Sequence, residues 1–239
     1  MIHTRTVDCY HFGFTLNLAA AQLRTLAGFL QSHGPAGVAL LGGRSAVASL
    51  QLDGIGSVVV KHYRRGGLIR HINRSRYLRT GKTRSQREFE QLNIARTLGI
   101  SVPQPIAYAH RGGLFYSAWL AARAIEQPIT LARLSLQDAD EARRAAVSAV
   151  EQIALLIQNN ILHVDLHPGN VVVDNRGRVY LVDFDKAGRY HGRRKKLAAR
   201  YVGRWQRAVV KHRLPQFLAE IIREGLSSAI NSLPSNPRV

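Results

Sequence analysis

Hydrophobic and polar positions follow two different rhythms along this chain, and the rhythm changes near residue 126. Before it, short runs rich in apolar and β-branched residues dominate, and such runs predict strands. The predicted strands cover residues 38–41, 46–52, 57–63, 105–109 and 114–120. One helical stretch interrupts them, at about 84–98, where Phe89, Leu92 and Ala95 recur at helical spacing. We therefore expect the first part to be β-rich with a single helix.

After residue 126 the pattern is helical. Residues 138–158 form a long amphipathic segment, and residues 197–231 look helical again, with an interruption at Pro215. The apolar side of the first segment is expected to carry Val147, Val150, Ile153, Ala154 and Ile157. The chain is thus predicted to be α+β, with a small β-rich N-terminal lobe (1–125) and a larger helical C-terminal lobe (126–239).

A cluster of polar residues surrounds a predicted hairpin in the second lobe. Two β-branched runs flank an Asn-Arg-Gly turn, which predicts a hairpin over 171–182. Asn170 stands just before its first strand and Asp183 just after its second. Upstream, the chain reads His-x-Asp165-x-x-x-x-Asn170, and downstream Asp183-Phe184-Asp185. The hairpin allows Asn170 and Asp183 to emerge on the same side and share a metal cluster.

This order and spacing is typical of a phosphotransferase with the two-lobed protein-kinase-like fold. Asp165 is the predicted catalytic base, which meets the acceptor hydroxyl. Asn170 and Asp183 are the predicted ligands of Mg²⁺, which prefers hard oxygen donors and bridges the phosphates of ATP. The alternative is that Asp165 and Asn170 are turn residues and that Asp183 caps the end of a strand. Turn formation alone, however, does not require this spacing of the three residues.

Neighbouring residues are given supporting roles. His163 is expected to brace the loop by hydrogen bonds, and Pro168-Gly169 to shape the turn that delivers Asn170. His167 either braces the loop or contacts substrate. Asp185 is either a second metal ligand or a structural partner for a nearby Arg.

The ATP-binding half is predicted upstream. Val58-Val59-Val60-Lys61 ends an apolar strand in a lysine, which suits a cation that pairs with ATP phosphates and a helix glutamate. Glu88 is the expected partner and Glu90 the alternative; a solvated strand end is the plain explanation of Lys61. Gly42 and Gly43 are candidates for a loop that closes over the phosphates, or for an ordinary hairpin turn.

Charge narrows the choice of partner. The 239 residues include 34 Lys and Arg against 15 Asp and Glu, a formal net charge of +19. Such an excess implies a polyanionic partner, either nucleic acid or an anionic membrane surface. Two tracts without any acid concentrate it: ten Lys and Arg over 61–87 and eleven over 186–219. In the second tract, cations at helical spacing accompany aromatic residues: Arg200, Arg204, Arg207 and Lys211, with Tyr201 and Trp205.

We expect that basic helix to contact a membrane interface with the aromatic residues as anchors, the alternatives being nucleic-acid contact and a solvated face. The single Cys9 excludes an intramolecular disulfide and suits a reducing cytoplasm. No apolar run is long enough to span a bilayer, and no signal peptide is apparent at the N-terminus. A cytoplasmic or peripheral location is expected.

Several elements resemble the 3-deoxy-D-manno-octulosonic acid (Kdo) kinase group of the lipopolysaccharide kinase family of Gram-negative bacteria. They are His62-Tyr63-Arg64-Arg65-Gly66-Gly67, Arg76-Tyr77-Leu78, Arg87-Glu88-Phe89, Val102-Pro103-x-Pro105 and Asp183-Phe184-Asp185. The resemblance implies ATP-dependent phosphorylation of a Kdo hydroxyl on a lipid A precursor at the cytoplasmic face of the inner membrane. The acceptor would be an anionic glycolipid, and basic residues of the Arg64–Arg87 tract are candidates for recognising its carboxylate.

Other acceptors remain open on the sequence. The 163–170 loop is also similar to that of aminoglycoside and choline kinases, so a kinase for heptose, aminoglycosides or another small molecule is the alternative. Val164 replaces the usual Arg before Asp165, which argues against control by activation-loop phosphorylation of the protein-kinase type. No Ala-Pro-Glu element follows Asp185, which also argues against a protein substrate. A nucleic-acid-binding protein on a degenerate kinase scaffold is a further alternative. The intact Lys61, Asp165, Asn170 and Asp183 argue against it.

Overall fold

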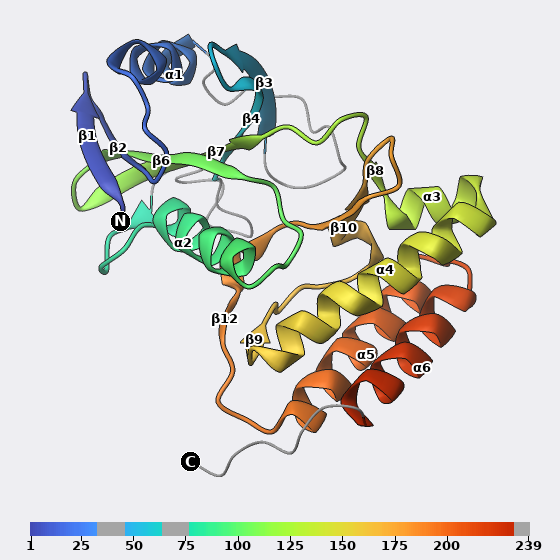
Figure 1. Cartoon of the computed structure of the whole chain (residues 1–239). Helices are drawn as coiled ribbons and strands as arrows, with labels where there is room; N and C mark the ends of the chain where they lie inside the picture. Colours follow the sequence, from blue (N-terminus) through green and yellow to red (C-terminus); the bar gives the residue numbers. More distant parts are fainter. Residues whose placement is uncertain (33–45, 64–76, 232–239) are drawn as a thin grey trace. The chain divides into compact units, whose positions relative to one another are not determined.

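The computed structural model of the chain describes residues 1–32, 46–63 and 77–231 (Figure 1). The chain divides into two compact units. The first comprises Met1–Asn93 and Gln104–Ala124, and the second Ile94–Pro103 and Ile125–Val239. The lobe boundary at 125/126 stays a prediction; in the structure, Ile94–Pro103 groups with the second unit.

The first unit is built on an antiparallel sheet. Among the described residues it has seven strands in the order β1-β2-β6-β7-β4-β3, with β5 paired to β7. They are β1 (His3–Val7), β2 (Tyr10–Phe14), β3 (Ala46–Leu52), β4 (Gly56–His62), β5 (Tyr77–Leu78), β6 (Pro105–Gly112) and β7 (Phe115–Arg123). The predicted strands at 46–52, 57–63, 105–109 and 114–120 are confirmed as β3, β4, β6 and β7. The one predicted at 38–41 lies outside the described residues.

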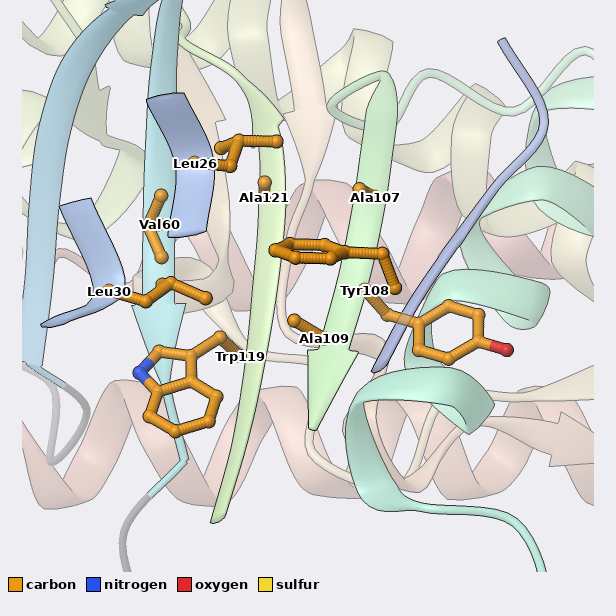
Figure 2. Close-up of a pocket in the computed structure, with 9 residues that line it drawn as sticks. Leu26, Leu30, Val60, Ala107, Tyr108, Ala109, Trp119 and Ala121 are labelled. Carbon is orange, nitrogen blue, oxygen red and sulfur yellow. The ribbon is translucent and has the colours of Figure 1, made fainter. Parts of the chain in front are cut away.

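Helix α1 (Ala20–Ser32) packs its apolar stripe on this sheet. Leu23, Leu26, Ala27 and Leu30 are buried with residues of the strands in one core cluster. Leu26, Leu30 and Trp119 are among the residues that line a cavity of about 10 Å³, which holds at most one water. Figure 2 shows Leu30 beside Trp119 and Leu26 near Ala121. The prediction of a single helix in this part of the chain was therefore wrong, because the i, i+3, i+4, i+7 spacing of these four residues is that of an amphipathic helix.

Helix α2 (Arg84–Thr97) confirms the helix predicted over 84–98. Thr83 caps its first turn, since the Gln86 N–H lies 3.2 Å from the Thr83 hydroxyl. Phe89 meets the Tyr108 ring edge to face, with the ring centroids 5.3 Å apart. The Tyr108 ring points away from the α1 side of the sheet (Figure 2). Its ring passes over Gly13 of the neighbouring strand, where an added Cβ would lie 2.2 Å from it.

The second unit is mainly helical. Its helices in the described residues are α3 (Leu131–Gln137), α4 (Ala139–Gln158), α5 (Arg194–Lys211) and α6 (Phe217–Asn231), and α6 packs on both α4 and α5 (Figure 1). The predicted helix at 138–158 and the break at Pro215 are confirmed. Asp138 caps α4 by accepting from Glu141 N–H at 2.9 Å. Val147 was wrongly assigned to the apolar side of α4, because its side chain is 51% exposed.

Short strands connect these helices. The predicted hairpin is confirmed as β10 (Val171–Val173) and β11 (Val179–Leu181), with β10 also paired to β8 (Ile129–Thr130). A second small sheet pairs β9 (Ile161–Leu162) with β12 (Gly188–Arg189). None of the helices in the described ranges combines the length and the apolar character needed to cross a membrane.

Candidate functional site

Lys61 and Glu88 form a partly buried ion pair in the first unit. Lys61 lies near the end of β4, and its Nζ is 2.9 Å from Oε2 and 3.1 Å from Oε1 of Glu88 on α2. Glu88 is only 2% exposed, and Tyr63 donates its hydroxyl to the same carboxylate. A buried carboxylate of this kind is held by such partners because desolvation would otherwise disfavour its charge.

The alternative partner, Glu90, lies on another side of α2. Its carboxylate accepts from Lys82 at 2.7 Å in an exposed pair. The two glutamates are two residues apart, so on a helix they point in different directions. The structure thus pairs Lys61 with Glu88. Gly42 and Gly43, the candidate phosphate loop, lie outside the described residues.

The catalytic-loop candidate in the second unit starts from a buried histidine. The His163 ring is 2% exposed, its Nε2 lies 2.9 Å from the Val182 carbonyl oxygen, and its edge meets Phe184. Burial lowers the pKa of His163, although the Val182 carbonyl and the Asp183 and Asp165 carboxylates act in the opposite direction. A neutral ring that donates to a carbonyl ties the loop to the end of β11, the bracing role expected of His163.

Tyr201 holds the same histidine from α5. Its hydroxyl accepts from the His163 backbone N–H at 2.8 Å and donates to the Ile161 carbonyl at 2.7 Å. Burial raises the pKa of Tyr201, so the hydroxyl keeps its proton for this bond. This residue has no signal in the loop sequence, because it comes from a helix 38 positions further along.

Asp165 and Asn170 are joined through a short 3₁₀ turn, η2 (Pro168–Asn170). His167 caps it, with its Nδ1 3.0 Å from the Gly169 N–H, which makes His167 a brace of the loop. The Asn170 Nδ2 donates to the Asp165 carbonyl at 2.8 Å. This bond fixes the orientation of the amide, so its oxygen is turned away from Asp165.

The hairpin then brings Asp183 back beside Asn170. Val171 pairs with Leu181, and the Val182 N–H donates to the Asn170 carbonyl at 3.0 Å, so Asp183 follows directly after this contact. Asp183 has a φ of 67°, the left-handed region that costs a residue with a Cβ about 1 to 3 kcal/mol. Asp185 lies in the turn η3 (Phe184–Lys186) that follows. The second unit therefore gathers Asp165, Asn170 and Asp183 around one loop and one hairpin.

Asp174, inside the hairpin turn, was missed by the sequence analysis. Its carboxylate accepts from the backbone N–H groups of Arg176 and Arg178 at 2.9 Å each, and from the Arg178 Nε at 2.7 Å. These bonds close the turn around Gly177, whose φ is +74°. An Asp at the start of an Asn-Arg-Gly turn is the signal that could have identified it.

The basic helix α5 corrects one expectation. Tyr201 and Trp205 were expected to anchor a membrane interface, but they are 2% and 1% exposed. The Trp205 indole N–H donates to the Leu218 carbonyl at 3.0 Å, so the ring belongs to the contact between α5 and α6. Arg204, expected on the same membrane-facing side, instead forms an ion pair with the Asp165 carboxylate.

Comparison with known proteins agrees with this geometry. Residues 40–214 match the family model described as "Lipopolysaccharide kinase (Kdo/WaaP) family". The chain is 33% identical over 184 residues to the 3-deoxy-D-manno-octulosonic acid kinase of Vibrio parahaemolyticus, an alignment that covers 76% of this chain and 72% of that protein. It is 35% identical to that of Vibrio vulnificus, with coverage of 60% and 61%, and 30% identical to that of Xylella fastidiosa, with coverage of 61% and 58%.

The match spans less than two thirds of the Vibrio vulnificus and Xylella fastidiosa proteins. The family model, however, covers the larger part of this chain, and its range includes Lys61, Glu88 and the whole of the loop and hairpin described above. The chain belongs to the lipopolysaccharide kinase (Kdo/WaaP) family.

Proposed function

We propose that this protein transfers the γ-phosphoryl group of ATP to a hydroxyl of 3-deoxy-D-manno-octulosonic acid on a lipid A precursor, in lipopolysaccharide core biosynthesis. The observation that carries the proposal is the joining of Asp165 and Asn170 by a hydrogen bond, with Asp183 returned beside Asn170 by the hairpin. The related proteins named above are kinases of this sugar acid, which supports the choice of acceptor.

In this proposal Asp165 accepts or orients the proton of the attacking hydroxyl. A carboxylate suits this work because it accepts hydrogen bonds only, and the Asp165 side chain is half-exposed although it is paired with Arg204. The loop is fixed around it by His163, Tyr201 and Asn170, so the carboxylate does not have to reorganise during the reaction. Phosphoryl transfer depends mainly on such positioning.

Mg²⁺ fits the residues on the other side of the loop. The Asn170 amide nitrogen is occupied by the Asp165 carbonyl, which leaves the amide oxygen to a cation. Asp183 supplies a carboxylate from the adjacent backbone. Two hard oxygen donors are what Mg²⁺ takes from proteins that also bind phosphates. When bound, the ion would neutralise charge on the phosphates of ATP.

Lys61 is proposed to bind the α- and β-phosphates of ATP. Its pairing with the buried Glu88 holds the ammonium group in one place, which is the arrangement that this class of enzyme uses. Gly42 and Gly43 remain candidates for the loop that covers the phosphates.

Peripheral contact with the anionic cytoplasmic surface of the inner membrane is also proposed. The net charge of +19 and the acid-free tract over 186–219 support it, since clustered cations attract anionic lipid. Exposed cations rather than buried Tyr201 and Trp205 would make this contact. It would place the enzyme where a membrane-embedded acceptor is found.

The test is phosphate transfer from ATP to a Kdo-lipid A precursor by Asp165→Asn. Loss of a positioned base lowers turnover by about 10²- to 10⁴-fold. The matched control is Asp140→Asn, which makes the same chemical change at an exposed position of α4 and should keep parental activity. A rate for Asp165→Asn near that of the parent would refute the role of Asp165. Failure of the parent protein itself to phosphorylate this acceptor would refute the choice of acceptor.

A further inference from the structure

A groove of about 580 Å³ lies beside the catalytic-loop candidate, wholly within the second unit. One wall is the chain leaving β9, and the other is a face of α5. Its lining residues are Leu162, His163, Val164, Lys196, Ala199, Arg200, Tyr201, Arg204 and Arg207. This volume is large enough for a sugar-sized ligand.

The α5 wall is strongly cationic. Lys196, Arg200, Arg204 and Arg207 follow one another at i, i+4, i+8 and i+11, which places them on one face of the helix. The opposite face is buried, so the cations line the groove rather than the core. The 18 residues of α5 include no Asp or Glu.

Carboxylates in the described part of the protein neutralise few of these cations. Among the described residues, the carboxylate that pairs with this row is that of Asp165, through Arg204, and Lys196, Arg200 and Arg207 have no carboxylate within 4 Å. Like charges spaced by one helical turn destabilise a helix. A row of this kind is best explained by an external anion that offsets the repulsion.

Two arginines are already oriented for such an anion. Arg204, which lines the groove, forms an ion pair with the Asp165 carboxylate. Arg200 stacks on the Tyr190 ring, with its guanidinium carbon 5.4 Å from the ring centroid, which limits the side-chain entropy lost on binding. A guanidinium binds a carboxylate in bidentate fashion, so Arg204 can exchange Asp165 for a ligand carboxylate.

We propose, on the basis of the function proposed above, that this groove binds the carboxylate of the acceptor sugar acid, with Arg204 as the first contact and Arg200 as the second. Because Arg204 contacts the predicted base, an anion bound to Arg204 lies close to a hydroxyl bound to Asp165, as a carboxylate on the same sugar residue would. Binding of the carboxylate releases Asp165 from Arg204 and leaves it free to meet the hydroxyl. Acceptor recognition is thereby assigned to α5, in addition to the Arg64–Arg87 tract, of which residues 64–76 lie outside the described part of the chain.

The experiment compares two water-soluble acceptors, the free sugar acid and its neutral carboxamide. The parent protein should prefer the acid in kcat/KM by about tenfold or more, the value of one charge-assisted contact. Arg200→Gln and Arg204→Gln should reduce that preference toward one by raising KM for the acid, with KM for ATP unchanged. Arg200→Lys, which keeps the charge, should recover part of the preference.

The matched control is Lys195→Gln, which removes an exposed cation from the same helix outside the groove and should keep the parental preference. Thermal unfolding of each variant checks that the fold is kept. Undiminished preference for the acid in both arginine variants would overturn the proposal. The proposal would also be overturned if the arginine variants lost only the preference for phosphorylated over dephosphorylated lipid A, since that result would assign the row of cations to a lipid phosphate. Loss of binding to phosphatidylglycerol vesicles alone would assign the row to the membrane, and would overturn the proposal as well.

Equilibrium binding separates this inference from the proposed function. Titration of the sugar acid and its carboxamide into the parent protein and the variants, without ATP, measures the groove alone. The parent protein could bind the acid selectively, through Arg200 and Arg204, and yet transfer no phosphate. That result would refute the proposed reaction and support the proposal that the groove binds the carboxylate. Equal binding of acid and carboxamide by the parent protein would refute the groove whatever the turnover.

Discussion

Arg204 of α5 donates to the carboxylate of Asp165, although the two residues are 39 positions apart in the chain and Arg204 belongs to a different element. The contact connects the predicted base to the basic groove. It predicts that the two residues act on one step. Because Arg204 must leave Asp165 before it meets the ligand carboxylate, Arg204→Gln should lower kcat/KM for the acceptor by about tenfold in the parent background and by a larger factor once Asp165 is replaced by Asn.

The check is a double-mutant cycle with ATP and acceptor both varied. Lys195→Gln, combined with Asp165→Asn in the same way, is the control and should be additive. Full additivity of Arg204→Gln and Asp165→Asn would mean that Arg204 works independently of the base.

Replacement of Lys61 should affect stability as well as nucleotide binding. Lys61→Met removes the cation beside Glu88, whose side chain is 3% exposed, and breaking such a pair should lower the free energy of unfolding by about 2 to 4 kcal/mol. The dissociation constant for ATP should rise at least tenfold. Lys82→Met is the matched control, because its pair with Glu90 is exposed and should contribute less than about 1 kcal/mol. Equal effects of the two substitutions in urea unfolding would speak against a special role for the Lys61–Glu88 pair.

Removal of one oxygen atom from Tyr201 tests the support of the loop. Tyr201→Phe leaves the His163 N–H and the Ile161 carbonyl without this partner inside the protein, at a cost of about 1 to 3 kcal/mol. Because His163 leads into Asp165, kcat should fall while KM for ATP stays the same. Tyr180→Phe, in which a half-buried hydroxyl makes a longer 3.4 Å contact, is the comparison and should cost less. A Tyr201→Phe enzyme with parental kcat would show that the bond stabilises the fold alone.

The hydrogen bonds that close the hairpin turn should contribute more to stability than the ion pair between Asp174 and Arg178. Asp174→Ala removes the acceptor of two backbone N–H groups and should lower the free energy of unfolding by about 2 to 3 kcal/mol. Arg178→Ala removes the ion pair of a guanidinium that is 56% exposed and should cost less than about 1 kcal/mol. The Mg²⁺ concentration for half-maximal activity should rise only in Asp174→Ala, since that turn positions Asn170 and Asp183. The opposite order of the two variants would disprove this explanation of the hairpin.

Acid should destabilise the first unit through His110. Burial, and after it the charges of Arg79 and His11, lowers the pKa of His110 from 6.5 to about 4. The unfolded chain then binds more protons between these values, so stability is fully present above pH 6.5 and falls as the pH drops toward 4, by up to about 3 kcal/mol. The glutamine in His110→Gln does not bind a proton in this range. The amount by which this substitution lowers the free energy of unfolding, relative to the parent protein, should therefore be about 2 kcal/mol smaller at pH 4.5 than at pH 7. The measurement is urea unfolding of the parent protein and His110→Gln at the two pH values, with His191→Gln, at an exposed position, as the control.

The elements that depend on neighbouring residues were predictable from the sequence. The strands β3, β4, β6 and β7, the helices α2 and α4 and the hairpin at 171–182 are encoded by local apolar period and turn residues, which act over a few positions. The same is true of the order of Asp165, Asn170 and Asp183, because the hairpin alone brings the last two together. Helix α1 had a helical period as well, and was missed among the surrounding strands.

Contacts between distant segments required the tertiary structure. The choice of Glu88 over Glu90 depends on the rotation of α2 against β4, which a helical period of 3.6 residues leaves uncertain by one or two positions. The amphipathic pattern of α5 shows a basic side and an aromatic side, but it does not identify what each side meets. Packing on α6 and the loop buried Tyr201 and Trp205, which sequence reasoning had assigned to a membrane, and turned Arg204 toward Asp165. The sequence thus determined which chemical groups the protein carries and their local frames, while long-range packing decided which of them meet, because burial and charge pairing act between residues that no local pattern connects.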